Sequence, residues 1–355
     1  KGIGERTKWG SLWENNAKMR DNQPLVSIIM PVYNCERFLE SALESVVLQE
    51  YKNWELLVID DNSTDGSSAI IKKYAGKEDR IIVLQNNTDV HGPGPARNIG
   101  LDHAKGDCIY FMDSDDWAEK SLLQCAVSRM QETGADIVQF GAIYERTDGN
   151  YLEYFWSGKN LLTKNEIKNN FSHFWNETRN SLWLYLFRRD AVEAIRFENM
   201  ISGEDICYVM DALSNAEKIA YIAKALYHYR YVDGSTSHRW VENVVECRER
   251  IWCHQRDFLQ SFQGDVHKMA YAEVAYDNYI WAIYQLSSRY CPLSYREKRR
   301  KLAHLKNTME FDAYRGIYPL NKQQGLDKVK YTLVKYRLEG MILLLGPIFL
   351  VFRGE

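Results

Sequence analysis

Short apolar segments alternate with amphipathic ones through the first 145 residues, and this alternation constrains the fold more than any other feature. Four mainly apolar runs have the pattern of strands buried on both faces: residues 25–30, 54–59, 80–84 and 108–112. Helices are expected between and after these strands: from Glu36, at 67–74, from Pro95 and at 119–131. Strands that alternate with helices form crossover units, so the sequence predicts an α/β fold with a mostly parallel, doubly wound sheet.

The regularity fades after a fifth expected strand at residues 136–144. Residues 150–235 mix aromatic runs and loops with one expected helix near 164–174, and the pattern is mainly helical from residue 240 onward. We therefore expect three parts: an N-terminal extension (1–23), an α/β domain (24–235) and a helical C-terminal region (236–355). Residues 1–18 are charged throughout and precede Met19, so we expect them to be an added or upstream segment rather than a signal peptide.

Composition excludes several classes of protein. The chain has 45 Lys and Arg against 48 Asp and Glu, a net charge of -3, which disfavours a dedicated nucleic-acid binder. Its seven cysteines form no CxxC pair, which favours a reducing compartment and no structural zinc site. No run approaches the roughly 18 apolar residues of a membrane span.

Two acidic clusters follow expected strands. Asp60 and Asp61 come after the second strand, and Asp113, Asp115 and Asp116 come after the fourth. Ligands of an open parallel sheet bind outside the carboxyl ends of its strands, so both clusters would face one crevice. Carboxylates this close repel one another unless a cation is present, and hard oxygen ligands suit Mg²⁺ or Mn²⁺ with phosphate oxygens completing the shell. Solvated helix caps are the alternative for either cluster alone, and two clusters at one edge make it weaker.

The Gly-rich segment at residues 92–97 is similar to a dinucleotide-binding fingerprint but does not fit it. The third glycine is missing, Pro93 and Pro95 lack the amides that would bind phosphate, and the segment follows the third strand rather than the first. An oxidoreductase is therefore disfavoured. Arg97 and Asn98, on the first turn of the following helix, remain candidate ligand contacts.

Five motifs together resemble glycosyltransferase family 2, the inverting, nucleotide-sugar-dependent enzymes of the GT-A fold. They are VSIIMPVYN (26–34), WELLVIDDNSTDGS (54–67), GPGPARNIGL (92–101), GDCIYFMDSDDW (106–117) and ISGEDICYV (201–209). They occur in the family's order and spacing, and the resemblance covers about residues 24–240. It implies a nucleotide-sugar half at 24–117 and an acceptor half at 118–235.

The resemblance also implies roles for individual residues. The nucleotide-sugar contacts would be Pro31, Val32, Tyr33, Asp61, Arg97, Asn98, Asp113, Ser114 and Asp115. Asp115 would ligate the Mn²⁺ or Mg²⁺ that bridges the diphosphate, and Asp205 would be the catalytic base with Glu204 beside it. In the loop that follows, His238 is a candidate second metal ligand and Arg239 a candidate phosphate contact, with a solvated loop as the equal alternative. In the solvated-loop alternative, His228 fills the core. Trp117 either stacks on a sugar ring or packs in the core.

The function that these features predict is transfer of a hexose or N-acetylhexosamine from a UDP-sugar to a hydroxyl of a glycan acceptor. Many relatives extend polyprenol-diphosphate-linked glycans, which implies a lipid-linked acceptor in bacterial surface-polysaccharide synthesis at the cytoplasmic face of the membrane. One alternative is a catalytically inactive nucleotide-sugar-binding or scaffold subunit. The other is a sugar-phosphate nucleotidyltransferase, although no Gly-rich basic loop follows the first strand.

The C-terminal region differs in charge from the rest of the chain. Residues 292–355 hold 13 Lys and Arg against 6 Asp and Glu, a net charge of +7, which leaves -10 for residues 1–291. A basic run at 296–301 and an apolar tail at 341–352 suit peripheral binding to an anionic membrane surface. A helix docked on the core and a homodimer interface are the alternatives.

Overall fold

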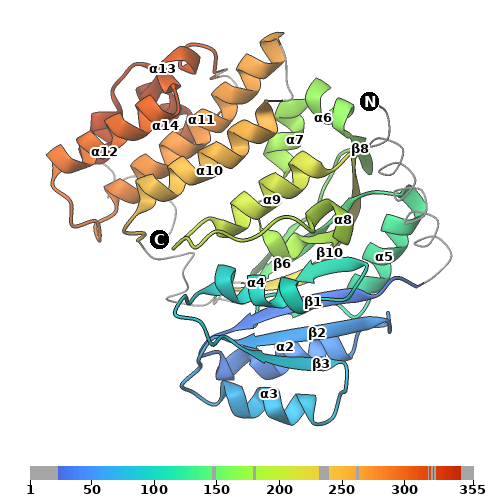
Figure 1. Cartoon of the computed structure of the whole chain (residues 1–355). Coiled ribbons are helices and arrows are strands. Elements are labelled where there is room, and N and C mark those ends of the chain that lie inside the picture. Colours follow the sequence, from blue (N-terminus) through green and yellow to red (C-terminus); the bar gives the residue numbers. More distant parts are fainter. Residues whose placement is uncertain are drawn as a thin grey trace, which may run out of the picture. The chain divides into compact units, whose positions relative to one another are not determined.

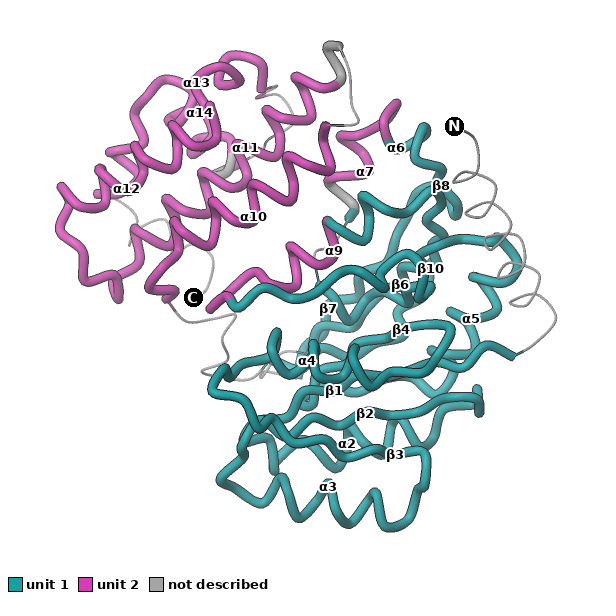
Figure 2. The backbone as a smooth tube through the Cα atoms, in the orientation of Figure 1, with its two compact units in different colours: residues 1–167, 177–199, 211–232 teal, residues 168–176, 200–210, 233–355 magenta. Residues whose placement is uncertain are grey.

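A computed structural model describes residues 23–145, 149–178, 181–231, 240–260, 264–318, 320, 323 and 325–344. The chain divides into two compact units (Figure 2). Unit 1 consists of residues 1–167, 177–199 and 211–232, and unit 2 of residues 168–176, 200–210 and 233–355. Residues 1–18, expected to be an addition, lie outside the described residues. The predicted boundaries at 23 and 235 stay predictions.

The N-terminal half of unit 1 is a parallel sheet with helices beside it (Figure 1). Its strands are β1 (Val26–Val32), β2 (Trp54–Asp60), β3 (Ile81–Gln85) and β4 (Cys108–Phe111), in the order β3-β2-β1-β4. Its helices are α2 (Glu36–Val47), α3 (Ser67–Ala75) and α4 (Pro93–His103). Every residue of β2 is buried, whereas burial alternates along the edge strand β3, as expected for strands with and without neighbours on both sides. All these elements match the alternation in the sequence.

The second half of the sheet is mixed. Its strands are β5 (Trp117–Ala118), β6 (Ile137–Glu145), β7 (Tyr151–Tyr154), β8 (Leu161–Thr163), β9 (Tyr185–Arg188) and β10 (Lys218–Arg230). The sheet continues from β4 as β9-β6-β10-β5, and β9 runs antiparallel to both of its neighbours. Further helices of unit 1 are α5 (Leu122–Thr133), most of α6 (Lys164–Asn169), α8 (Arg189–Val192) and the last five residues, 211–215, of α9 (Glu204–Asn215). The α/β class is confirmed, and the parallel arrangement holds for the first four strands.

Close packing fixes α4 against the parallel half. A Cβ at Gly100 would lie 2.5 Å from Cγ2 of Ile29 in β1 and 3.0 Å from Cδ1 of Ile59 in β2. Both isoleucines are fully buried, so a side chain larger than hydrogen would push the helix away from the sheet. Because α4 carries Arg97, this contact positions one of the candidate site residues.

Unit 2 is helical, as the sequence predicts for residues 240 onward (Figure 2). Its helices are α10 (Val244–Leu259), α11 (Gly264–Ser287), α12 (Tyr295–Thr308), α13 (Phe311–Tyr314) and α14 (Gly325–Lys335), with most of α7 (Phe171–Glu177) and residues 204–210 of α9. Tyr276 of α11 packs against Phe311, Tyr318 and Tyr331, whose rings form the aromatic core of the unit. Among the described residues, no helix has both the length and the apolar character needed to cross a membrane.

Candidate active site

The parallel half of the sheet brings the predicted acidic clusters to one edge. β1 pairs with β2 and β4 on its two sides, and all three strands run in the same direction. The backbone continues this pairing beyond the strands, because the Asp61 amide donates to the Val32 carbonyl (2.8 Å). The chain segments at Val32, Asp61 and Met112 therefore leave the sheet next to one another, as the sequence predicts for its two carboxylate clusters.

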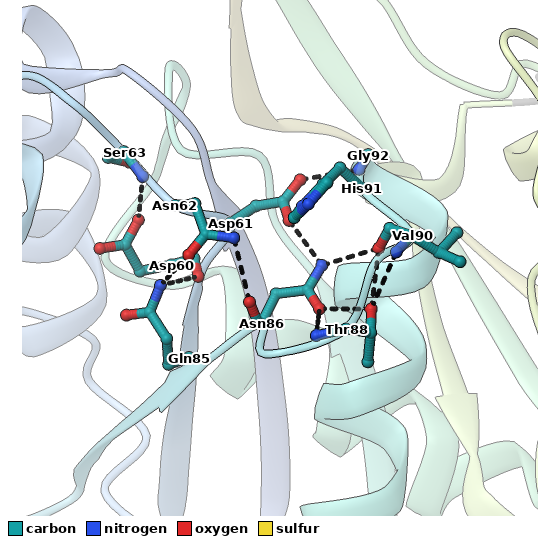
Figure 3. Close-up of polar contacts among 10 residues, drawn as sticks. All are labelled: Asp60, Asp61, Asn62, Ser63, Gln85, Asn86, Thr88, Val90, His91 and Gly92. Atoms are coloured by element: carbon teal, nitrogen blue, oxygen red, sulfur yellow. Dashed lines mark hydrogen bonds and ion pairs between the residues drawn. The ribbon is translucent and has the colours of Figure 1, made fainter.

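Asp61 holds the loop between β3 and α4 (Figure 3). Its Oδ1 accepts a hydrogen bond from Asn86 Nδ2 (2.6 Å) and lies 2.9 Å from His91 Nδ1, and its Oδ2 accepts from the Gly92 amide (2.7 Å). The carboxylate is buried, with 5% of the residue exposed. Gly92 has a φ of 121°, a conformation that a side chain would strain, and it directly precedes α4. Asp61 is therefore the anchor for the start of that helix.

The turn after β1 is tied to the turn after β2. Asn34, whose φ is 47°, accepts a hydrogen bond from the Thr64 amide on its Oδ1 (2.8 Å), and its own amide donates to Ser63 Oγ (3.1 Å). Val32 is buried and Pro31 half-buried, whereas Tyr33 is 62% exposed. The Tyr33 ring thus stands at the strand edge with an apolar face open to a ligand.

The three acids after β4 have different surroundings. Asp113 forms an ion pair with Arg97 (2.8 Å). Asp116 is buried and accepts from the Tyr227 hydroxyl (2.8 Å) and the Arg230 amide (2.7 Å). Burial, followed by the negative charge of Asp113, raises the pKa of Asp115 to about 6. Asp116 is thus committed to the protein's own structure, while Asp115 is a carboxylate whose charge lacks full compensation.

The donor set fits a divalent cation that shares its shell with a ligand. The described residues contain no group of three or more His, Cys, Asp or Glu side chains arranged to hold a metal ion. A hard cation such as Mg²⁺ is commonly bound through one or two carboxylates, with phosphate oxygens and water as its other ligands. A cation near Asp115 would offset the burial and repulsion that raise its pKa. His238 and Arg239, the other predicted ligand and phosphate contacts, lie outside the described residues.

Glu204 and Asp205 begin α9 and belong to unit 2. Gly203 precedes them with a φ of 92°, which favours glycine over any residue with a side chain. Glu204 is buried and Asp205 half-buried, and Asp205 Oδ1 accepts a hydrogen bond from the Ile206 amide (2.8 Å). The acidic pair thus occupies the first turn of a helix, where backbone amides and the helix dipole stabilise negative charge.

Other predicted site residues have contacts within unit 1. The Asn98 side chain makes two hydrogen bonds with the backbone of Phe197: its Nδ2 donates to the carbonyl (2.9 Å), and its Oδ1 accepts from the amide (2.8 Å). Ser114 is buried beside the Cys35 thiol, where it lowers the pKa of that thiol against the larger effect of burial. Trp117 stacks on His228 with ring centroids 3.3 Å apart, so it packs within the protein. His228 is buried between Glu119 (3.1 Å) and Glu145 (3.0 Å), in agreement with the core alternative.

Comparison with known proteins identifies the family. The sequence model described as "Glycosyl transferase family 2" matches residues 27–196. An uncharacterized glycosyltransferase of Haemophilus influenzae is 32% identical over 242 residues, which are 65% of this chain and 91% of that protein. The chain belongs to glycosyltransferase family 2.

Other members of family 2 match over different shares of their length. Glycosyltransferase GlyA of Streptococcus pneumoniae is 34% identical over 227 residues, 61% of this chain but only 32% of GlyA. A Campylobacter jejuni GalNAc(5)-diNAcBac-PP-undecaprenol beta-1,3-glucosyltransferase is 30% identical over 207 residues, 58% of this chain and 65% of that protein.

Solved structures confirm the GT-A type of fold for this family 2 chain. Residues 1–349 of TarS from S. aureus match with a TM-score of 0.66 at 22% identity, over 90% of this chain and 91% of TarS 1–349. The mannosyltransferase PcManGT of Pyrobaculum calidifontis, in complex with GDP-Man and Mn²⁺, matches with a TM-score of 0.53 at 15% identity, over 98% of this chain and 96% of that one.

Sequence reasoning on this family 2 site did not find several residues that build it. Asn86 and His91 bond Asp61, and Arg230 donates to the Asp115 carbonyl (2.7 Å). Asn86 directly follows the third strand, so its position at a strand end was a usable signal. Arg230 offered none, because it meets Asp115 from 115 residues further along the chain.

Proposed function

We propose that this family 2 enzyme transfers a hexose or N-acetylhexosamine from a UDP-sugar to a glycan hydroxyl, with inversion at the anomeric carbon. The observation that supports it most is the meeting of Asp61 and the Asp113–Asp116 cluster at one edge of the parallel strands. S. aureus TarS 1–349 has been solved in complex with UDP-GlcNAc and with UDP, which favours uridine as the nucleoside.

Asp61 has the capacity to contact a base. A carboxylate has about four lone-pair positions, and the loop from Asn86 to Gly92 uses three of them. The fourth, on Oδ2, is proposed to accept the imide N–H of uracil, with the exposed Tyr33 ring against the base and Pro31 and Val32 forming the strand edge. Asp113, held by Arg97, is proposed to contact the ribose or sugar, with Ser114 and Asn98 supporting the segments on either side.

Asp115 is the proposed ligand for Mn²⁺ or Mg²⁺, with His238 as a second ligand. A bound divalent ion would stabilise the charge that grows on the leaving diphosphate. The residues around Asp115 support this role, since the Arg230 guanidinium fixes its backbone and Asp116 is occupied elsewhere. Asp115, which lies beyond the end of β4, would be the protein's carboxylate ligand to that cation.

Asp205 is the proposed general base, with Glu204 beside it. A carboxylate that accepts the acceptor hydroxyl's proton commonly contributes about 10²–10⁴-fold to the rate. Its place in the first turn of α9 supports the charged form that a base requires. A single displacement from the face opposite the diphosphate inverts the anomeric centre, so one base and one stabilised leaving group are sufficient.

The proposed acceptor is lipid-linked, in bacterial surface-polysaccharide synthesis at the inner face of the plasma membrane. The name of the Campylobacter relative gives an undecaprenol-linked acceptor for that protein. In unit 2, Leu338, Met341 and Leu344 are exposed, and Arg299 and Arg337 are exposed on the same C-terminal helical region. Exposed apolar side chains among cations suit an anionic membrane surface. A homodimer through this patch is the alternative.

UDP release from a panel of UDP-sugars, with and without Mn²⁺, tests the proposal. Transfer should require an acceptor and Mn²⁺, Asp205→Asn should bind UDP but lose transfer, and Asp115→Ala should lose Mn²⁺-dependent UDP binding in calorimetry. Asp102→Asn is the matched control, because Asp102 is exposed and its ion pair with Arg196 lies at the surface. Nucleotide binding without transfer to any acceptor would favour the scaffold alternative, and formation of UDP-sugar from UTP would favour the nucleotidyltransferase. Flotation with anionic vesicles, before and after deletion of residues 328–355, separates membrane binding from dimerisation.

A further inference from the structure

Arg230 is the last residue of β10, and both its backbone and its side chain are bonded to the turn that follows β4. Its amide donates to Asp116 Oδ1 (2.7 Å), and its Nη1 donates to the Asp115 carbonyl (2.7 Å). The guanidinium carbon also lies 4.8 Å from the centroid of the Phe38 ring, in the first turn of α2. These contacts hold the guanidinium in one place, next to the backbone of the proposed metal ligand.

The Arg230 guanidinium keeps donors that the protein does not use. Arginine carries its N–H groups in a planar fork, and the bond to the Asp115 carbonyl uses one of them on Nη1. Across the described residues, Nε and Nη2 of Arg230 have no hydrogen-bond partner, and neither nitrogen is buried. Both are therefore accessible to a ligand, and they share one edge of the guanidinium plane. Such an edge matches two oxygens of a phosphate through two parallel hydrogen bonds.

The carboxylates around Arg230 are bonded by other groups. They are Asp113, held by Arg97 (2.8 Å), Asp116, held by the Tyr227 hydroxyl (2.8 Å), and Glu145, which lies opposite Arg230 on β6 and is held by His228 (3.0 Å). The remaining acid, Asp115, is the one proposed to bind the metal ion. In the part of the chain that the structure describes, Arg230 itself forms no ion pair. A half-buried cation is costly when no counter-charge accompanies it, so this guanidinium suits an anionic ligand.

We propose that Arg230 contacts the diphosphate of the donor directly through Nε and Nη2, as a second positive charge beside the metal ion. This inference rests on the proposed function, which brings a nucleoside diphosphate to this edge of the sheet. A divalent ion bound to Asp115 has part of its charge cancelled by that carboxylate, so it does not neutralise a diphosphate alone. The negative charge on the diphosphate grows as the sugar is transferred, and a cation fixed in advance stabilises it without reorganisation.

The test measures the ratio of UDP affinity to uridine affinity by calorimetry, with Mn²⁺ and in EDTA. We expect Arg230→Met and Arg230→Gln to lower UDP affinity about ten- to hundredfold in both conditions, the range for a lost charge-assisted hydrogen bond. Uridine affinity should stay the same, because uridine has no phosphate. The measurement in EDTA separates a direct contact from an indirect one, since a residue that only positions Asp115 acts on UDP through the metal ion. Arg230→Lys keeps the charge but loses the planar edge, so its ratio should lie between those of Arg230→Met and the wild type.

Arg80→Met is the matched control. Arg80 also lies over an aromatic ring, that of Trp54 (3.7 Å), and donates to the Lys52 carbonyl (2.9 Å), but Glu78 takes its other donors. It precedes β3, at the opposite edge of the parallel strands, so its loss should lower the urea midpoint and leave the affinity ratio unchanged.

Several results would overturn the inference. One is a folded Arg230→Met or Arg230→Gln protein that keeps the wild-type ratio in EDTA, including one that loses UDP affinity only with Mn²⁺. An equal fall of the ratio in Arg80→Met is another. If the wild type itself binds UDP no more tightly than uridine in either condition, the proposed function fails instead, whatever the Arg230 variants do.

Discussion

Replacement of Asp61 by asparagine removes one carboxylate oxygen from the loop anchor in Figure 3 and changes little else. An asparagine at this position has one acceptor and one donor end. If its oxygen faces Asn86 and His91, the Gly92 amide meets an NH₂ group. If its oxygen faces Gly92, the Asn86 amide loses its bond of 2.6 Å. In both orientations a donor at a buried site loses a charged acceptor.

The cost follows from these bonds. A hydrogen bond to a charged group contributes about 1.5–3 kcal/mol, and a buried donor left without an acceptor adds its own desolvation penalty. Asn86 Nδ2 keeps its bond to the Val90 carbonyl (2.9 Å) in either case. The orientation in which Asn86 loses its bond to residue 61 is therefore the less costly one. We expect Asp61→Asn to destabilise the segment from Asn86 to Gly92 by about 2–3 kcal/mol. UDP affinity should fall as well, because the same carboxylate is proposed to contact the base.

Hydrogen exchange of the backbone amides in residues 86–96 measures the local effect, and the urea midpoint measures the global one. Asp102→Asn is the control for loss of one negative charge, since its surface ion pair with Arg196 should contribute less than about 1 kcal/mol. UDP titration by calorimetry completes the set. Equal exchange rates and equal urea midpoints in Asp61→Asn and Asp102→Asn would refute the view that the carboxylate holds this loop.

Three further outcomes follow from packing and ionisation. Gly100→Ala should lower stability by about 1–2 kcal/mol in urea unfolding, because overpacking against β1 and β2 outweighs the gain in helix propensity, whereas Gly316→Ala, with nothing within 4 Å of its Cβ, should change stability little. The ion pair with Arg80 lowers the pKa of Glu78 to about 2. The stability that this ion pair contributes is therefore present above the unfolded-state pKa of 4.5 and is lost as the pH falls from 4.5 toward 2. The difference in urea midpoint between wild type and Glu78→Gln should shrink below pH 4.5. Burial raises the pKa of Cys35 to about 11, so mass spectrometry should find it unmodified by iodoacetamide at pH 8 until urea unfolds the protein; rapid labelling of the native protein would contradict this.

The sequence predicts the parallel half of the sheet well because each of its strands is an apolar run. β1 and β2 are buried on both faces, and that burial requires the continuous hydrophobic pattern that sequence reasoning detects. β9 has only four residues, and its place in the sheet depends on antiparallel pairing with β4 and β6. Both partners are distant in sequence, so no local pattern indicates the pairing. β10 is longer, but its pairing with β6 shifts register between Tyr221 and Tyr227, so its burial follows no single period.

The residues of the candidate site also fall into two groups, those that the sequence indicates and those that only the tertiary structure brings together. Carboxylates at strand ends could be identified because their position depends on local sequence and on the general geometry of parallel sheets. The groups that hold them could not, because they arrive through the tertiary fold: Asn86 is 25 residues from Asp61, and Tyr227 is 111 residues from Asp116.

The Asp113–Asp116 segment shows why residue type alone does not assign a role. Its three aspartates are equivalent in sequence, yet one pairs with Arg97, one is bonded by Tyr227 and the Arg230 amide, and one is left with a raised pKa. Asp116 is the most deeply buried, and burial raises its pKa well above the usual range. It nevertheless receives two donors from β10, so its function is to join the end of β4 to that strand. The acid best suited to bind a cation is therefore the one whose negative charge is disfavoured by burial and by a neighbouring carboxylate. By this criterion it is Asp115.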